Sequence, residues 1–237
     1  MSKEIFGRIH SFESLGTLDG PGVRTVIFSQ GCPLRCGCCH NPDTWEINAG
    51  RTFTATELLE KVKRYKNYYG NNGGVTISGG EPLLQAEFYA ECFRLFKSEN
   101  IHTCLDTSGY TLNNGVKTLL SLTDLVLLDV KYTKEELYES YVGTSYAKVL
   151  EFLEYLNKNN IKTIIRQVII KGLNDDEENA KALKELKSKY SCIDKIELLP
   201  FKKICKAKYD NLKIKFAFED KETPSIATLK KLELLIS

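Results

Sequence analysis

The chain has 237 residues, of which 42% are hydrophobic and 27% are charged, a composition typical of one globular domain with a sizeable core. Its 33 Lys and Arg residues nearly balance its 31 Asp and Glu residues, so the formal net charge is +2. This balance argues against a nucleic-acid binder, whose basic residues would dominate one face. We interpret the short basic runs KVKRYK (61–66) and FKKICKAK (201–208) as solvated faces.

The sequence also restricts where the protein works. No apolar run approaches the roughly 18 residues that a membrane-spanning helix requires. The segment MSKEIFGRIH (1–10) lacks the long apolar core of a secretion signal. We therefore expect a cytoplasmic protein whose thiols stay reduced, which excludes a disulfide framework.

Short β-branched runs alternate with amphipathic helical stretches from residue 23 onward. Strands are predicted over 23–30, 74–80, 101–109, 123–131, 161–172 and 194–200. Helices are predicted over 54–68, 85–98, about 134–158, a stretch that ends near 189, and roughly 224–236. Thr54 and Glu57 match a capping box at the start of the first helix. Asn174 and Asp175 are expected to cap the helix that ends near 189.

Strand–helix alternation repeated about six times predicts parallel strands with right-handed crossovers. Either a partial (β/α) barrel or an open doubly wound sheet fits this pattern, and in both the chemistry gathers at the carboxyl ends of the strands. Each predicted strand has polar or glycine-rich residues at or near its end. In chain order these are a cysteine loop, Ser78-Gly79-Gly80-Glu81, Asp106-Thr107, Asp129 with Lys131, Arg166 within the fifth strand, and Pro200–Lys202. Together they predict a functional site on one rim.

The loop QGCPLRCGCCHNPDTW (30–45) places four cysteines within eight positions. Structural zinc sites usually take two separated pairs of ligands, whereas this loop offers one compact cluster. Three thiolates would hold three irons of a cubane [4Fe–4S] cluster and leave the fourth iron open, because complete ligation needs four. Cys32 and Cys36 could be joined in such a set by Cys39 or by Cys38. The isolated Cys92, Cys104, Cys192 and Cys205 are interpreted as small buried or incidental thiols.

The spacing Cys32-x3-Cys36-x2-Cys39, followed by SGGEP (78–82), resembles the motif of the radical S-adenosylmethionine superfamily. GRIHSFESLGTLDGPGVRTVIFSQGC, CHNPDTW, GGVTISGGEPLLQ, NIHTCLDTSGY, TDLVLLDVK and KIELLPF resemble the pyruvate formate-lyase-activating enzymes, a branch of the glycyl-radical-enzyme activases, over about residues 7–201. The resemblance implies an α/β fold, a partial (β/α)6 barrel of parallel strands with outer helices. It also implies a single domain over 1–237, with a core of about 23–201 and a C-terminal extension of 202–237.

The resemblance further implies an oxidoreductase that cleaves S-adenosylmethionine reductively at a [4Fe–4S] cluster, giving methionine and a 5′-deoxyadenosyl radical. That radical would abstract hydrogen from a glycine of pyruvate formate-lyase, with flavodoxin or ferredoxin as the electron donor and a monomeric activase. Three alternatives stay open: an activase of another glycyl-radical enzyme, a small-molecule radical enzyme, and a non-catalytic zinc module.

The site residues follow from the same resemblance. Cys32, Cys36 and Cys39 would be the cluster ligands and catalytic residues. The cofactor would contact Cys38, Cys39, His40, Gly79, Gly80, Glu81, Asp129, Val130, Lys131, Arg166 and Lys202. A monovalent cation would be held by Asp106, Thr107 and Asp129.

Each type of residue suits its role. The glycine pair admits the methionine moiety without a Cβ, Glu81 accepts from its amino group, and Arg166 binds its carboxylate bidentately. The sequence departs from the family at Cys38, where an aromatic residue is expected, and at Lys202, where a histidine is expected, so the roles of these two residues stay open.

Overall fold

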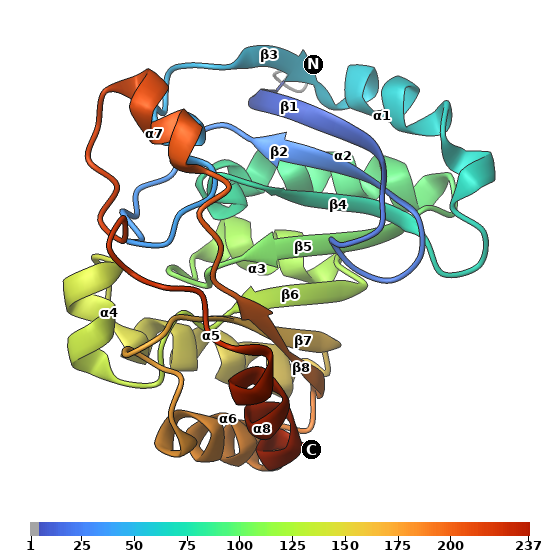
Figure 1. Ribbon diagram of the computed structural model, residues 1–237. Helices are drawn as coiled ribbons and strands as arrows, with labels where there is room; N and C mark the ends of the chain where they lie inside the picture. The colour runs from blue at the N-terminus through green and yellow to red at the C-terminus, as the bar shows by residue number, and fades with distance from the viewer. Residues whose placement is uncertain (1–4) are drawn as a thin grey trace. The chain divides into compact units, whose positions relative to one another are not determined.

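The computed structural model describes residues 5–237, so the first four residues of the segment 1–10, which bears on the secretion signal, lie outside the described residues. The strands are β1 (Phe6–Gly16), β2 (Arg24–Ser29), β3 (Arg51–Thr54), β4 (Gly74–Gly79), β5 (His102–Thr107), β6 (Leu125–Asp129), β7 (Thr163–Ile169) and β8 (Ile193–Pro200) (Figure 1). The α-helices are α1 (Ala55–Lys63), α2 (Ala86–Ser98), α3 (Asn114–Ser121), α4 (Glu135–Tyr141), α5 (Tyr146–Lys158), α6 (Glu177–Lys189), α7 (Lys206–Leu212) and α8 (Ile226–Ile236). Short 3-10 helices are η1 (Pro42–Thr44), η2 (Lys66–Tyr68) and η3 (Pro82–Gln85). Within residues 5–237, no helix has the length and apolar character needed to cross a membrane.

The strands form one eight-stranded sheet in the order β3-β1-β2-β4-β5-β6-β7-β8. β2 pairs in parallel with β4, β4 with β5, and β7 with β8, whereas β1 pairs antiparallel with both β2 and β3. All six predicted strands are present, and the predicted α/β fold of mostly parallel strands with outer helices is confirmed. Within residues 5–237 the sheet has two further strands, β1 and β3, which pair antiparallel and were not predicted. β1 lacks a regular alternation of buried and exposed residues, and β3 is only four residues long, so neither has a clear sequence pattern.

The described chain forms two compact units. The first unit contains the residues up to Pro33 together with Thr44–Thr107 and Thr111–Leu127. The second unit contains Leu34–Asp43, Ser108–Tyr110 and Leu128–Ser237. The single domain expected over 1–237 stays a prediction.

The first unit has its core between the sheet and its helices. α2 and α3 lie on the same face of β4 and β5 (Figure 1). Val26 and Ile27 of β2 and Val75 and Ile77 of β4 are fully buried. The predicted capping box of α1 is confirmed, because Thr54 accepts from the Glu57 N–H at 3.1 Å and Glu57 accepts from the Thr54 N–H at 2.8 Å. The helix ends at Lys63 rather than at residue 68, and η2 follows it as a separate turn.

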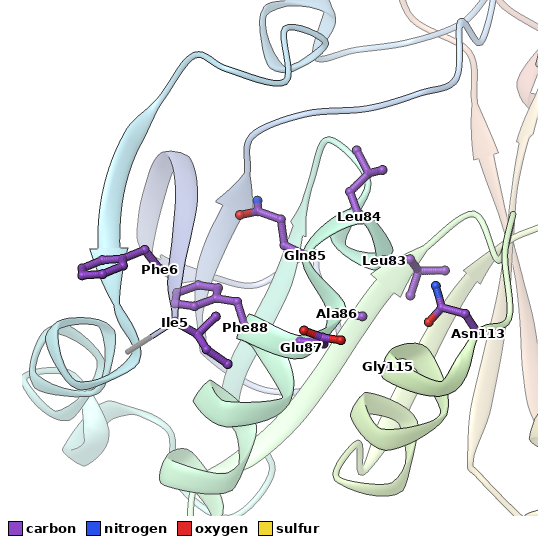
Figure 2. A pocket seen from close by; sticks show the side chains of 10 residues that line it. All are labelled: Ile5, Phe6, Leu83, Leu84, Gln85, Ala86, Glu87, Phe88, Asn113 and Gly115. Atoms are coloured by element: carbon purple, nitrogen blue, oxygen red, sulfur yellow. The ribbon is translucent and has the colours of Figure 1, made fainter. Parts of the chain in front are cut away.

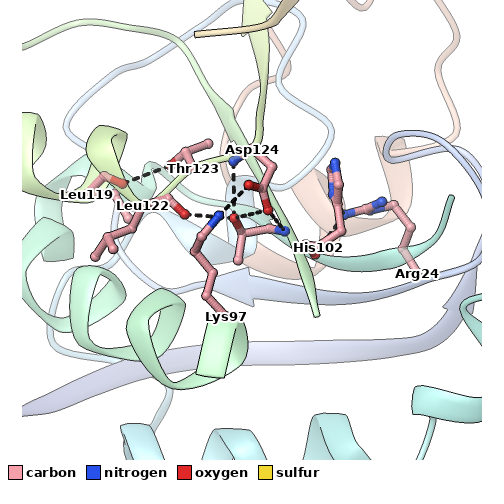
Figure 3. Close-up of polar contacts among 8 residues, drawn as sticks. Arg24, Lys97, His102, Leu119, Leu122, Thr123 and Asp124 are labelled. Carbon is pink, nitrogen blue, oxygen red and sulfur yellow. Dashed lines mark hydrogen bonds and ion pairs between the residues drawn. The ribbon is translucent and has the colours of Figure 1, made fainter. Parts of the chain in front are cut away.

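A polar network joins the amino ends of β2, β4 and β5, and Figure 3 shows the part of it from Arg24 and His102 to Asp124 and Lys97. Arg24, which is fully buried, donates to the carbonyls of Pro21 at 3.0 Å and Val75 at 2.8 Å, and to the Thr76 hydroxyl at 2.7 Å. Its Nη2 also donates to the carbonyl of His102 at 3.3 Å. Because each group of the guanidinium meets an acceptor, the chain itself solvates this buried cation.

The same network continues along the amino end of β5. Asp124 accepts from the backbone N–H of Thr103 at 2.9 Å and from its hydroxyl at 3.0 Å, and it pairs with Lys97 (Figure 3). Burial opposes the shift, but Lys97 and Thr103 hold the pKa of Asp124 below its ordinary value. A carboxylate thus fixes the loop before β6.

The second unit differs from the prediction in two places. The helical stretch expected around 134–158 is two helices, α4 and α5, which are separated at Gly143, where φ is +81°. The cap of α6 is Asp176, which accepts from the Asn179 N–H at 2.8 Å, and not Asn174 or Asp175. Those two side chains accept instead from backbone N–H groups at 170 and 172, so they close the preceding turn. α6 and α8 pack against each other and against β8.

Candidate functional site

The cysteine loop begins in the first unit, directly after β2. Gly31, with φ of +94°, turns the chain out of the strand, a conformation that favours glycine. Its N–H donates to the Thr44 carbonyl at 2.8 Å, and the N–H of Cys32 donates to the Trp45 carbonyl at 3.3 Å. The backbone of the first predicted ligand and of the residue before it is therefore tied to the segment that follows the loop.

The other loop cysteines lie in the second unit. The Cys39 N–H donates to the Cys36 carbonyl at 3.0 Å, which closes a tight turn between them. The N–H groups of residues 35 and 37 donate to the last carbonyls of the α4 segment, at Val142 and Tyr141. Cys36 and Cys39 are half-buried, whereas Cys38 is 8% exposed, and burial raises the pKa of the Cys38 thiol to about 11. The turn therefore distinguishes an inward Cys38 from two more accessible neighbours.

The C-terminal segment packs onto this turn, which no sequence pattern indicated. The Tyr209 hydroxyl donates to the Cys39 carbonyl at 3.0 Å, and Lys208 bonds Asn41 at 2.9 Å and Asp43 at 3.0 Å. A Cβ on Gly37 would lie 2.5 Å from the ring of Phe218, so the segment fits a loop that has glycine there.

Cys205 belongs to the same arrangement. Its side chain is 2% exposed at the start of α7, and burial and then the neighbouring Cys39 raise the pKa of its thiol. The interpretation of Cys205 as a buried thiol fits this position, but the sequence did not indicate its proximity to the cysteine loop.

A half-buried ion pair lies at the carboxyl end of β6 in the second unit. Lys131 Nζ lies 2.5 Å from Asp129 Oδ2, and the Lys131 N–H donates to the Tyr138 hydroxyl at 2.9 Å. Burial opposes the shift, but Asp129 and then Cys36 raise the pKa of Lys131 well above its ordinary value. The side chain of Val130 is buried, and its N–H donates to the Arg166 carbonyl at 2.9 Å. The structure thus brings a permanent cation close to Cys36.

Arg166 and Glu197 are direct partners across β7 and β8, with Nε donating to the carboxylate at 3.0 Å. Lys195 also pairs with Glu197 at 2.7 Å. Burial opposes the shift, but Lys195 and Arg166 hold the pKa of Glu197 below its ordinary value. This pairing orients the guanidinium plane of Arg166, and the sequence analysis missed Glu197 because a cross-strand partner depends on register.

His40 and Lys202 also meet in the second unit. A ring nitrogen of His40 donates to the Lys202 carbonyl at 3.0 Å, while the Lys202 side chain is exposed. Burial lowers the pKa of His40, so the ring is neutral near pH 7. The backbone of Lys202 is thus joined to the residue after the last predicted ligand.

The first unit gathers the other predicted rim residues at the ends of β4 and β5. Glu81 is 2% exposed and accepts from the Thr107 hydroxyl at 2.6 Å and the Leu83 N–H at 3.1 Å. Ser78 donates to Asp106 at 2.7 Å. Thr107 and Leu83 are neutral donors, so they stabilise the carboxylate of Glu81 without cancelling its charge.

The glycine pair has a packing role that the sequence analysis did not foresee. Gly79 has φ of +102°, and a Cβ there would lie 2.6 Å from the Ser29 nitrogen. A Cβ on Gly80 would lie 2.3 Å from the Gly31 carbonyl oxygen. The Gly80 N–H donates to the Ser29 carbonyl at 2.9 Å, and the Glu81 N–H donates to the Gly31 carbonyl at 2.8 Å. The backbone at residues 79 and 80 packs so closely against the end of β2 that this packing alone explains why both residues are glycine.

The predicted ligands are divided between the units. Cys32 lies in the first unit and Cys36 with Cys39 in the second, and Asp106 and Thr107 are likewise separated from Asp129. Joint ligation of a cluster or a cation stays a prediction. Within each unit the chemistry suits the expected groups, with thiols for iron and buried charges for a zwitterionic cofactor.

A pocket of about 300 Å³ lies elsewhere on the first unit, at the start of α2 (Figure 2). Gln85 on its wall accepts from the Arg8 N–H at 2.6 Å and donates to the Arg8 carbonyl and the Ser29 hydroxyl, so it joins β1 to β2. None of the predicted site residues lines this pocket.

The sequence profile of the Radical SAM superfamily matches residues 26–183. The chain is 41% identical over 232 residues to the pyruvate formate-lyase 1-activating enzyme of Escherichia coli (strain K12), covering 97% of this chain and 94% of that protein. It is 43% identical over 230 residues to the pyruvate formate-lyase-activating enzyme of Clostridium pasteurianum, covering 97% and 96%. The crystal structure of Streptococcus suis SuiB bound to precursor peptide SuiA has the same fold, with a TM-score of 0.68 and 18% identity over 89% of this chain and 44% of that one.

Proposed function

The chain belongs to the radical SAM superfamily and, within it, to the pyruvate formate-lyase-activating enzymes, and we propose that Cys32, Cys36 and Cys39 hold its [4Fe–4S] cluster. It is the activase of pyruvate formate-lyase (formate C-acetyltransferase), an oxidoreductase that uses the cluster and S-adenosylmethionine. When bound, these two groups supply an electron and a 5′-deoxyadenosyl radical that abstracts hydrogen from a glycine of pyruvate formate-lyase.

The observation that carries the ligand assignment is the turn from Cys36 to Cys39. Its hydrogen bond draws these two residues together, and both are more accessible than Cys38, whose side chain is 8% exposed. Cys38 therefore contributes backbone contact and packing rather than a thiolate, while His40 holds the chain after the last ligand through the Lys202 carbonyl.

The remaining residues bind and orient the cofactor. Glu81 accepts from its amino group, and Gly79 and Gly80 leave the end of β4 free of side chains. Glu197 accepts from Nε of Arg166 and so orients the guanidinium group. The two terminal nitrogens of Arg166 donate to the carboxylate of the cofactor. Lys131 and Asp129, with Val130 between them, meet the amino acid and ribose portions, and Lys202 meets the ribose or adenine.

Further parts of the proposal rest on the family pattern. Asp106, Thr107 and Asp129 hold a monovalent cation beside the cofactor carboxylate. The electron donor is a flavodoxin or ferredoxin, the activase is a monomer, and it works in the cytoplasm as one domain.

The decisive experiment replaces each loop cysteine by Ala and measures iron content, visible absorption and S-adenosylmethionine cleavage without air. Cys32→Ala, Cys36→Ala and Cys39→Ala are expected to lose the cluster and the cleavage, whereas Cys38→Ala keeps substantial activity. If Cys38→Ala loses the cluster and Cys39→Ala keeps it, the ligand assignment is wrong. Zinc in place of iron would make the protein a metal-binding module instead.

The substrate is tested separately. Incubation with pyruvate formate-lyase, S-adenosylmethionine and a one-electron reductant is expected to give the doublet electron paramagnetic resonance (EPR) signal of a glycyl radical. Cleavage of S-adenosylmethionine without this doublet would favour another glycyl-radical enzyme or a small-molecule substrate.

A further inference from the structure

We propose that residues 202–218 form a docking surface for an acidic one-electron carrier protein, placed directly over the cysteine loop. The proposal rests on the function above, because it concerns delivery of the electron that the cluster needs. It revises the interpretation of FKKICKAK as a merely solvated face.

The first observation is the concentration of charge in this segment. Residues 202–218 contain six lysines and one aspartate, a formal charge of +5. Since the whole chain has a net charge of +2, all the other residues together carry −3. A single segment thus makes an otherwise acidic chain net basic, which is the asymmetry that steers an acidic partner toward one place.

The second observation is which of these side chains face solvent. Lys206 is held in ion pairs with Asp210 at 3.0 Å and Glu219 at 2.8 Å. Lys202, Lys203, Lys213 and Lys215 are exposed. Among them lies Ile204, which is 77% exposed, with Leu212 at 44% and Ile214 at 38%. This segment therefore combines exposed apolar side chains with exposed lysines, a composition that suits a docking surface for an acidic protein.

The third observation is what the buried side of the same segment contacts. Tyr209 donates to the Cys39 carbonyl, Lys208 bonds Asn41 and Asp43, and the Phe218 ring lies against Gly37. All these residues belong to the second unit. The exposed lysines and the residues that contact the cysteine turn therefore belong to one short segment, so a protein bound to this segment lies near Cys39.

An acidic carrier fits these observations better than the other partners. The carrier is oxidised by one electron and the cluster is reduced by one electron, with no bond made or broken, so the partner needs proximity to Cys39 rather than access to the cofactor. Nucleic acid would need basic residues spread over a face, whereas the other residues carry −3. Pyruvate formate-lyase must instead present a glycine to the cofactor. The test below distinguishes the two partners, because it measures cluster reduction and pyruvate formate-lyase activation separately.

The test uses the anaerobic holoenzyme with a photoreduced acidic flavodoxin as the probe. Two measurements are made: the affinity of flavodoxin for the activase, and the rate at which it produces the EPR signal of the reduced cluster. The test variant is Lys213→Glu/Lys215→Glu. A second variant, Ile204→Ser, removes the most exposed apolar side chain of the segment. The matched control is Lys181→Glu/Lys230→Glu, which makes the same change in charge at two exposed lysines of α6 and α8.

We expect the test variant to lower both affinity and reduction rate at least about tenfold at low salt, with the difference shrinking as salt screens the charges. Ile204→Ser should lower the affinity at all salt concentrations, and the control should stay close to the unchanged protein. Dithionite should reduce the cluster of every variant at the same rate.

Equal affinity and reduction rate in test and control variants would overturn the proposal. So would a test variant that fails to activate pyruvate formate-lyase while flavodoxin reduces its cluster normally, since the surface would then belong to the substrate enzyme. If dithionite-reduced activase does not cleave S-adenosylmethionine, the proposed function fails, whereas flavodoxin affinity still decides for or against this surface.

Discussion

The two ends of the same strands in the first unit bury polar groups in opposite ways. At the amino ends, the Arg24 cation is surrounded by backbone carbonyls and a hydroxyl that belong to the fold. At the carboxyl ends, the Glu81 carboxylate is held by Thr107 and Leu83, which are neutral. The amino end therefore completes its own solvation, whereas at the carboxyl end we propose that the Glu81 carboxylate meets the amino group of the cofactor. A buried charged residue therefore does not by itself indicate a ligand site, because the groups that contact it decide whether its role is structural.

The largest effect expected from this comparison is on stability, at the amino end. Arg24→Leu removes the guanidinium donor from three backbone carbonyls, so the free energy of unfolding should fall by about 3 kcal/mol, at about 1 kcal/mol for each lost hydrogen bond. Urea unfolding of the metal-free protein measures it. Arg94→Leu is the control, because Arg94 is exposed and its pair with Glu91 contributes little. Equal losses in the two variants would remove the contrast between the ends.

The next effect is on cofactor binding, at the carboxyl end. Glu81→Gln keeps an acceptor for Thr107 and removes the charge, so S-adenosylmethionine affinity should fall about 10- to 100-fold, as for loss of a charge-assisted hydrogen bond. Unfolding free energy and iron content should change little. Calorimetric titration of the reconstituted protein measures the affinity, with the exposed Glu60→Gln as the control. If iron content falls as much as affinity, Glu81 has a structural role like that of Arg24.

A smaller effect extends the comparison to the cysteine turn. Tyr209→Phe removes one hydrogen bond to the Cys39 carbonyl, worth about 1 kcal/mol, so a chelator should extract iron about five times faster. Tyr68→Phe, at a side chain that is 61% exposed, is the control. Unchanged iron release would mean that other contacts of the C-terminal segment hold the turn.

The smallest effect is a pH dependence at the amino end. Burial and then the Arg24 charge lower the pKa of His102 from its ordinary 6.5, so below that value the unfolded chain takes up more protons than the folded one. Stability is complete above pH 6.5 and declines as pH falls toward the lower folded pKa. Urea midpoints between pH 7 and 5.5 should fall less in His102→Gln than in the unchanged protein. An unaltered slope in His102→Gln would assign the dependence to His40, whose pKa is lowered in the same direction.

Local patterns predicted much of this molecule. The six parallel strands and the Thr54–Glu57 capping box depend on residues near each other in sequence, and both are present. The prediction that Asn174 caps α6 was wrong because a short polar side chain can equally well close the preceding turn. The cysteine spacing and the SGGEP motif indicated the family through local sequence alone.

What could not be predicted depends on distant contacts. Tyr209 meets Cys39 across 170 positions and Lys208 meets Asn41 across 167, so no window of sequence contains either pair. Glu197 becomes the partner of Arg166 through the register of two strands. The glycine pair was assigned to the cofactor, yet the end of β2 alone requires both residues. Residue types were therefore predictable at the site, but the neighbours that orient them were not.

The hydrogen bond from the Glu81 N–H to the Gly31 carbonyl has a mechanical consequence. Gly31 immediately precedes Cys32, the proposed first cluster ligand, so a ligand that displaces Glu81 also displaces the peptide bond before Cys32. A ligand bound at the end of β4 can thereby shift the backbone at the end of β2 through one hydrogen bond.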